Sequence, residues 1–290
     1  MLGIALVFCA LACFATLDTV TKYVTLTVPV MFALWFRYAF QAVMTTCIMW
    51  PQRRASLWRT QRLDLQCLRG TLLLLTSMFT FMSLTFMPVG EFTAVAMITP
   101  LVVTLLAALL LKERVSVWRW LMVAGGFTGT LLIIQPGGGL WGWLLLLPLS
   151  QVLAYASFQI LTSRMVHTED PITMHFYTGW VGTALASLPL YFFWQPPTRW
   201  VEWAGLLVMG LTGSLGHFCL IHAFRKAQAA TLTPIFYAQI GMAMLGGWLM
   251  FSHLPDGWAL CGMALIAVCG ATSAWLAVLE SRVRTHPLPA

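Results

Sequence analysis

The chain has 290 residues, of which 60% are hydrophobic and 9% are charged, and its mean hydropathy is +0.83. A soluble domain carries about 25% charged residues. The composition therefore excludes an ordinary soluble enzyme, a disordered chain and a disulfide-stapled secreted module. Because about 20 apolar residues span a bilayer, the long apolar blocks predict an all-α polytopic membrane protein rather than a β-barrel of short alternating strands.

Ten apolar blocks follow one another along the chain, separated by proline, glycine or charge. They cover residues 2–25, 30–50, 65–87, 91–111, 116–135, 141–163, 171–194, 204–224, 230–251 and 257–279. The first block lacks a basic segment before it and a small-residue cleavage site after it, which favours a retained span over a cleaved signal peptide. The blocks predict ten transmembrane helices.

Basic residues gather in alternate connections and so indicate the orientation. If the N-terminus is cytoplasmic, the cytoplasmic segments hold thirteen of the sixteen Lys and Arg residues: Arg53, Arg54, Arg59, Arg62, Arg69, Lys112, Arg114, Arg119, Arg164, Arg225, Lys226, Arg282 and Arg284. This asymmetry follows the positive-inside rule. We expect a multi-pass protein of the bacterial inner membrane with both termini cytoplasmic. The net charge of +7 then reflects topology, and no nucleic-acid partner is expected.

The sequence repeats itself at an offset of about 140 residues. The corresponding positions are Phe14–Thr16 with Tyr155–Ser157, Phe36 with Phe176, Gly70 with Gly210, Trp118 with Trp258 and Ala124 with Ala264. Five blocks per half is an odd number, so the second half enters the membrane from the opposite side. We predict two inverted five-helix repeats, 1–136 and 140–280, followed by a short cytoplasmic tail, 281–290.

Several stretches also resemble a known family. They are Pro88–Ala94, Thr99-Pro100, Leu110–Arg114 and Gly125–Gly129 in the first half, and Ala227–Ala230, Pro234 and Gly246–Trp248 in the second. With ten spans in two halves, the whole chain resembles the EamA-type transporters of the drug/metabolite transporter superfamily. It departs from their usual Gly-Glu at the end of the ninth block, where Ser252–Asp256 stands. The resemblance implies secondary transport of a small organic metabolite.

Charged residues inside the spans of the first half indicate either a charge partner or a functional role, because burying a charge in a bilayer is costly. Asp18 and Lys22 are four residues apart, so they share a helix face. They either neutralise each other, with Lys22 reaching the interface, or leave Asp18 to contact a cationic substrate group or a coupling proton. Arg37 either pairs with Asp18 across helices or binds an anionic group.

The second half contributes uncharged and titratable candidates. Tyr155 and Gln159 lie on the helix that corresponds to the helix of Asp18, and the candidate His217 is flanked by two glycines. Tyr237 and Gln239 complete the predicted substrate-binding or coupling set. Ordinary helix packing with satisfied hydrogen bonds remains the alternative for each.

Two prolines should interrupt spans. Pro100 and Pro234 are expected to kink or open the fourth and ninth helices, which is tolerable only where protein or a cavity covers the freed carbonyl groups.

Several chemistries have no signature in the sequence. The seven cysteines form no CxxC pair, so we expect reduced, buried thiols and no bound metal. A P-loop is absent, and ATP hydrolysis and a cofactor are not expected.

These features predict a secondary active transporter that works by alternating access, not an enzyme. The segments Gly216–Arg225 and Thr233–Tyr237 resemble members that carry cofactor-like molecules such as riboflavin or S-adenosylmethionine. The alternatives are an amino-acid or drug exporter of the same superfamily and, more remotely, a lipid-modifying membrane enzyme or a non-transporting receptor subunit. The sequence leaves open whether a proton or another ion gradient drives transport and whether the protein forms a homodimer.

Overall fold

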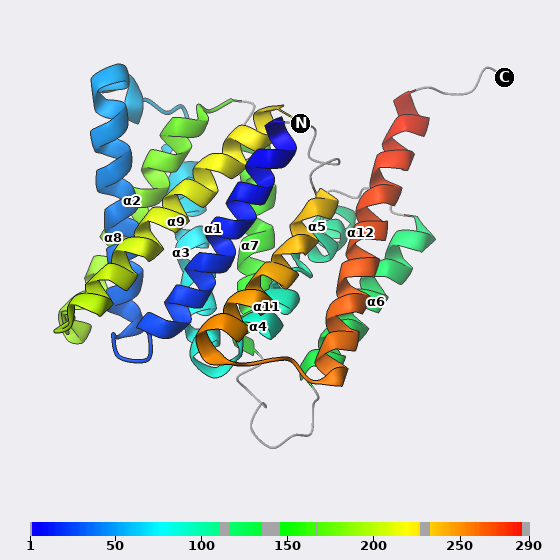
Figure 1. Cartoon of the computed structure of the whole chain (residues 1–290). Helices are drawn as coiled ribbons and strands as arrows, with labels where there is room; N and C mark the ends of the chain where they lie inside the picture. Colours follow the sequence, from blue (N-terminus) through cyan, green and yellow to red (C-terminus); the bar gives the residue numbers. More distant parts are fainter. Residues whose placement is uncertain (1, 111–115, 135–145, 166–167, 227–232, 286–290) are drawn as a thin grey trace.

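The computed structural model describes residues 2–110, 116–134, 146–165, 168–226 and 233–285, and the regular elements in these ranges are helices (Figure 1). The α-helices are α1 (Leu2–Val24), α2 (Val30–Arg53), α3 (Leu63–Phe86), α4 (Val89–Ala96), α5 (Thr99–Leu110), α6 (Val117–Ile134), α7 (Leu146–Met165), α8 (Pro171–Leu190), α9 (Trp200–Lys226), α11 (Ala238–Phe251) and α12 (Gly257–Thr285). Three short 3₁₀ helices accompany them: η1 (Arg54–Trp58), η3 (Tyr191–Phe193) and η4 (Thr233–Tyr237).

In the described part of the chain these helices form ten rods, when α4 with α5 and η4 with α11 are each counted as one. Four described helices are long and apolar enough to cross a membrane: Gly3–Val24, Leu63–Phe86, Trp200–Leu220 and Gly257–Leu276. Four further apolar helices are shorter: Val89–Val103, Val117–Ile133, Leu146–Thr162 and Ile235–Phe251. Helix α1 begins and α12 ends at the same edge of the bundle (Figure 1), which an even number of crossings requires.

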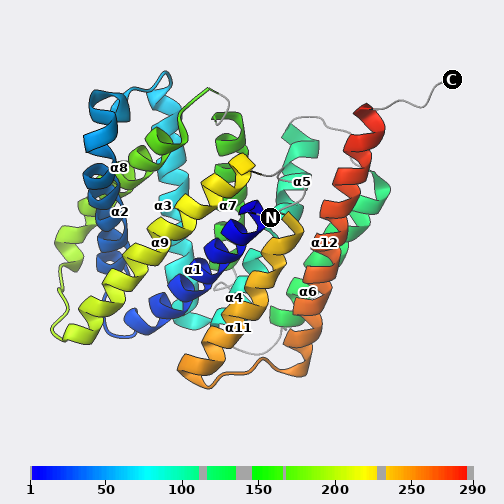
Figure 2. The same ribbon diagram turned by 45° about the horizontal axis from the view of Figure 1, so that its top comes forward.

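The contacts between the two halves follow a two-fold pattern. Each of the pairs α2 with α8, α6 with α12 and α4 with α11 joins a rod to its counterpart in the other half. The first rod of each half also packs on the third rod of the other, as α1 on α9 and α7 on α3. Figures 1 and 2 show these pairs side by side. This is the arrangement expected of inverted repeats.

Both fourth rods change geometry at corresponding places. In the first half Met97 and Ile98 form a turn between α4 and α5, directly before Pro100. The Thr99 hydroxyl donates to the Ala96 carbonyl at 2.6 Å and so satisfies a carbonyl group at the break. In the second half η4, which contains Pro234, gives way to α11 at Ala238. The side chain of Pro234 lies outside the described residues.

Local sequence explains how α8 begins. The carboxylate of Asp170 accepts hydrogen bonds from the backbone N–H groups of Ile172, at 2.8 Å, and Thr173, at 3.3 Å. Pro171 occupies the first helical position, where a missing N–H costs nothing. The neighbouring carboxylate of Glu169 accepts from the Thr60 hydroxyl at 2.8 Å and from the Gln61 N–H at 2.9 Å. The two acids therefore fasten α8 to the segment between η1 and α3.

The pair α6 and α12 packs through glycine. A Cβ added at Gly129 would lie 2.8 Å from the carbonyl oxygen of Gly262 and 2.8 Å from Cγ1 of Ile266. The two backbones are therefore in direct contact, as in the small-residue interfaces of membrane helices.

The prediction that the cysteines are buried is wrong in part. All seven are free, and Cys219 and Cys269 are buried. The other side chains are Cys13, which is half-buried, and Cys9, Cys47, Cys67 and Cys261, which are exposed. In a membrane protein an apolar side chain can face lipid as well as the core, so composition alone does not place it inside.

Candidate functional site

Buried polar side chains lie along the contact between the two halves. Helices of the first half contribute Asp18, Arg37, Gln41 and Arg69, and helices of the second half contribute His175 and Gln239. All six are buried, and burial of polar or charged groups in such an interior requires partners.

Asp18 connects helices of both halves. Its side chain is 9% exposed, lies within electrostatic range of Arg37 on α2 and is hydrogen-bonded to the side chain of Gln239 on α11. The charge of Asp18 also acts on Tyr155 of α7, whose hydroxyl is hydrogen-bonded to Gln159. Asp18 and four other residues predicted from the sequence therefore lie together.

Arg37 is 3% exposed and only partly satisfied. Its Nη1 donates to the Ser77 hydroxyl of α3 at 2.7 Å, and the Tyr38 hydroxyl is 2.9 Å from the same oxygen. The guanidinium carbon lies 4.9 Å from the centre of the Tyr38 ring. Among the described residues, Nε of Arg37 has no hydrogen-bond partner. Arg37 and Asp18 thus influence each other without a direct ion pair.

Two histidines of the second half face these charges. The Gln41 side-chain nitrogen lies 3.4 Å from Nδ1 of His175 on α8. His217 on α9 makes an edge contact with the Phe14 ring of α1, with ring centres 5.0 Å apart. The charges of Arg37 and Arg69 act on both histidines. His217 therefore joins the predicted set around Arg37, and His175 extends it.

Arg69 belongs to this interior and not to a loop. The prediction that Arg69 is one of the cytoplasmic basic residues is wrong, because α3 begins at Leu63 and buries Arg69 to 4% exposure. Its Nη1 donates to the Met174 carbonyl at 2.9 Å and to the Thr178 hydroxyl at 2.7 Å. Its Nε donates to the Thr162 hydroxyl at 3.1 Å. Arg69 thereby fastens α3 to α7 and α8.

Lys22 lies apart from Asp18, in a second polar cluster. Its Nζ donates to the carbonyl groups of Leu84 and Met87, each at 2.8 Å, and lies within electrostatic range of Glu91. The Glu91 carboxylate is 2.8 Å from Nε2 of His253, beyond the end of α11. No local signal in the sequence marks His253 as a partner of Glu91.

Tyr237 packs against α12. Its hydroxyl lies against Gly270 of α12, where a Cβ would overlap it. Within the described part of the chain this hydroxyl has no hydrogen-bond partner. The structure therefore brings Tyr237 into the apolar core shared by η4 and α12.

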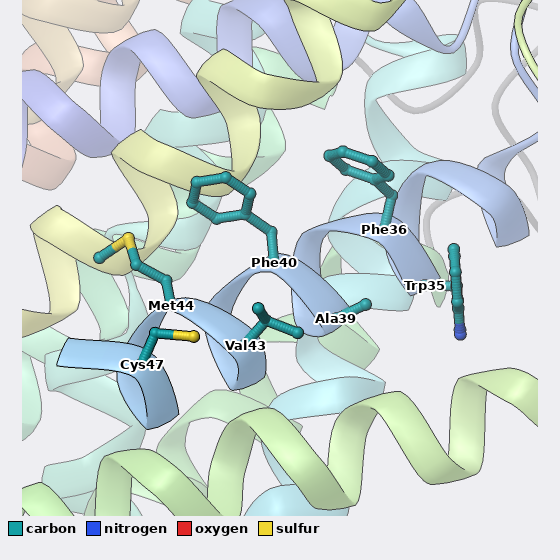
Figure 3. Close-up of a pocket in the computed structure, with 7 residues that line it drawn as sticks. All are labelled: Trp35, Phe36, Ala39, Phe40, Val43, Met44 and Cys47. Atoms are coloured by element: carbon teal, nitrogen blue, oxygen red, sulfur yellow. The ribbon is translucent and has the colours of Figure 1, made fainter. Parts of the chain in front are cut away.

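A hollow of about 410 Å³ lies along α2, but its lining is apolar. Figure 3 shows the seven lining side chains along one stretch of this helix: Trp35, Phe36, Ala39, Phe40, Val43, Met44 and Cys47. Val43 is 55% exposed, so the hollow opens to the surroundings of the bundle. It is distinct from the polar interior.

Ten helical rods in two related halves, with polar groups buried between them, define a polytopic helical membrane protein. The chain belongs to the EamA-like transporter family, whose sequence profile matches residues 1–135 and 141–273. A solved crystal structure has the same fold, with a TM-score of 0.67 and 20% sequence identity. The superposition covers 96% of this chain and 98% of the solved chain.

Curated relatives are named as transporters. A riboflavin transporter of Rhizobium johnstonii is 31% identical over 207 residues, covering 70% of this chain and 66% of the relative. An S-adenosylmethionine uptake transporter of Rickettsia felis is 28% identical over 250 residues, covering 86% and 84%. A pseudopaline exporter of Pseudomonas aeruginosa is 25% identical over 270 residues, covering 92% and 93%. The match with the riboflavin transporter spans just under two thirds of that protein.

Proposed function

We propose that the protein is a secondary active transporter that moves a small organic metabolite across the bacterial inner membrane. Its two halves, 1–136 and 140–280, would rock against each other and expose the site to each side in turn. The observation that carries the proposal is the group around Asp18, which draws Arg37 from the first half and Tyr155 and Gln239 from the second. A substrate held there touches both halves, so their relative motion changes its access.

The substrate proposed first is a cofactor-like molecule, either S-adenosylmethionine or riboflavin. The names of two relatives support this class. Tyr155 stacks on Phe158, with ring centres 5.9 Å apart and planes 11° apart, and such aromatic side chains suit a planar ring system. The carboxylate of Asp18 suits a cationic group, which S-adenosylmethionine carries and riboflavin lacks.

We also propose that a proton gradient drives transport, with Asp18 and His217 as the residues that exchange the proton. A carboxylate and an imidazole are side chains that can do so near neutral pH when their surroundings adjust them. The orientation with both termini cytoplasmic is supported by the basic residues of the alternate connections.

A flux assay with the full chain in sealed proteoliposomes tests the proposal. Vesicles loaded with unlabelled S-adenosylmethionine or riboflavin should accumulate the labelled compound by exchange, and an imposed pH gradient should raise the initial rate. Empty liposomes and an Asp18→Ala variant, each prepared in the same way, serve as controls. Absence of exchange or gradient-driven uptake over a broad metabolite panel would contradict the transporter proposal.

Export is the second candidate direction, and the likeness to a pseudopaline exporter over 92% of the chain favours including it. The same vesicles separate the two directions. Once protein orientation has been assigned by protease accessibility of an added terminal tag, gradients of opposite sign show which direction of flux is coupled.

A further inference from the structure

The buried arginines have almost no acidic side chains as partners. Among the acidic side chains that the structure describes, each one other than Asp18 has partners elsewhere: Asp64 with Arg62, Asp170 with Arg53, Glu202 with Arg199, Glu91 with His253, Glu169 with Thr60 and Gln66, and Asp256 with the Ala259 N–H. Of these acids, Asp18 lies within electrostatic range of Arg37, and the other buried guanidinium group, that of Arg69, has neutral partners. The interior between the halves therefore carries an excess of positive charge.

Arg69 and Arg37 differ in how well they are satisfied. Arg69 donates to three neutral oxygens, from Thr162, Met174 and Thr178. Arg37 donates only through Nη1, to Ser77, and its Nε is buried without a partner in the described part of the chain. An unpartnered donor on a buried cation is costly. Of the two, Arg37 is thus the buried cation with a donor left unpartnered.

The unpartnered edge of Arg37 lies against a glycine of the other half. A Cβ added at Gly213 of α9 would lie 3.0 Å from Nε of Arg37 and 3.7 Å from Nη2. Since residue 213 has no side chain, the backbone of α9 packs directly against this edge and buries Nε. The Nε and Nη2 groups of an arginine form a fork that matches the two oxygens of a carboxylate. The fork lies between α2 and α9, one helix from each half.

We infer that Arg37 binds a carboxylate of the transported molecule through Nε and Nη2, so that the substrates are carboxylate-bearing metabolites. This inference rests on the proposed function and narrows it. Asp18, within electrostatic range of Arg37, is placed for an adjacent ammonium group. S-adenosylmethionine has such a head group, whereas riboflavin has none. Because the α9 backbone covers this edge in the structure, the carboxylate reaches Nε and Nη2 when α2 and α9 separate, and it then neutralises Arg37.

Binding measurements with matched probes test this inference. The purified full chain is titrated calorimetrically with S-adenosylmethionine, methionine and tryptophan, and with the decarboxylated form of each. Loss of the carboxylate should weaken binding to the wild-type chain by about tenfold or more. In Arg37→Gln the two members of each pair should bind alike. Arg37→Lys keeps the charge but loses the fork, so it should restore only part of the preference.

Two further variants control for misfolding and for a general effect of removing a positive charge. Gly213→Ala retains Arg37 but places a methyl group against its Nε edge, and it should reduce binding of the carboxylate-bearing member only. Arg62→Gln, which alters an exposed arginine, should retain the wild-type preference. If Arg37→Gln does not yield folded protein, Arg37→Lys and Gly213→Ala carry the test.

Equal binding of both members of every pair to the wild-type chain would overturn the inference. So would a preference that persists in Arg37→Gln and Gly213→Ala, or a failure of every carboxylate-bearing probe to bind. Flux of riboflavin without any carboxylate preference would leave the proposed transport intact and overturn this inference alone. A carboxylate preference in binding with no flux of any probe would instead contradict the proposed transport.

Discussion

The two halves meet through two regions of different chemistry. Where α1 and α2 face α9, the contact contains Asp18, Arg37 and His217, which are charged or titratable. Where α6 meets α12, the contact is between backbones at Gly129 and Gly262. Both regions join a rod of one half to a rod of the other, so the same fold symmetry holds two unlike interfaces.

The difference indicates that the polar region serves substrate binding and the glycine contact serves stability. Buried charges contribute little net stability, because desolvation offsets their attraction, so the polar region is poorly suited to holding the fold together. Close backbone packing contributes contact energy but offers no group that can bind a polar substrate. Substitutions in the polar region should therefore change transport more than folding, and substitutions at the glycine contact should do the reverse.

The largest expected effect on transport is that of Arg37→Gln. The variant removes Arg37 as the partner of the substrate carboxylate. Loss of one partner of a buried charge pair weakens binding by about 2–5 kcal/mol, so uptake of a carboxylate-bearing substrate should fall to near background. Membrane insertion and thermal stability should remain close to wild type. Initial uptake rates in proteoliposomes, normalised to reconstituted protein, measure the first effect, and fluorescence-detected gel filtration measures the second. Unchanged uptake would remove the distinction between the two regions.

The largest expected effect on stability is that of Gly129→Leu. The new side chain would overlap the backbone of α12, and overpacking of this kind costs about 3 kcal/mol or more. Thermal unfolding in detergent should show the loss, while uptake per folded molecule stays near wild type. Gly241→Leu is the matched control, because a Cβ at Gly241 meets nothing within 4 Å. Equal destabilisation by the two leucines would contradict a specific role for the α6–α12 contact.

A smaller effect is expected for His253→Ala. The variant leaves the buried carboxylate of Glu91 without its 2.8 Å partner, which should destabilise the fold by about 1–2 kcal/mol. His222→Ala is the control, since Nδ1 of His222 lies 3.0 Å from the carbonyl oxygen of Phe218 on its own helix. Thermal unfolding of both variants gives the comparison, and a larger loss in His222→Ala would contradict the account of the Glu91 cluster.

The smallest effect is expected for Arg62→Gln. Arg62 forms an exposed pair with Asp64, with Nη2 2.9 Å from Oδ2, and such surface pairs contribute little. Uptake and thermal unfolding should both match wild type. A clear loss of uptake would show that arginines outside the interior matter as much as Arg37.

The sequence predicted the helical fold and the repeat because both are local or periodic patterns. Apolar length marks the spans, and a constant offset marks the halves. The partners of single polar residues could not be predicted in the same way. Lys22 contacts carbonyl groups more than 60 residues away, and Glu91 meets His253 across the halves. Which helix faces are opposed decides such contacts, and one sequence does not contain that information.

Arg69 illustrates the same difficulty. Six residues separate it from the start of α3, and its position near other arginines made it resemble a loop residue. Only the packing of α3 against α7 and α8 buries it. The candidates Asp18, Arg37, Tyr155, Gln159, His217 and Gln239 lie together because the repeat places their helices around one interface.

The central claim is that groups buried between the halves handle the substrate, and solute exchange in proteoliposomes tests it most directly. Wild type, Asp18→Ala and His217→Ala are reconstituted to equal density, and exchange of labelled S-adenosylmethionine and riboflavin is followed in each. The account predicts exchange of at least one compound by wild type and a clear reduction in both variants, with equal membrane insertion. Normal exchange in both variants would contradict it.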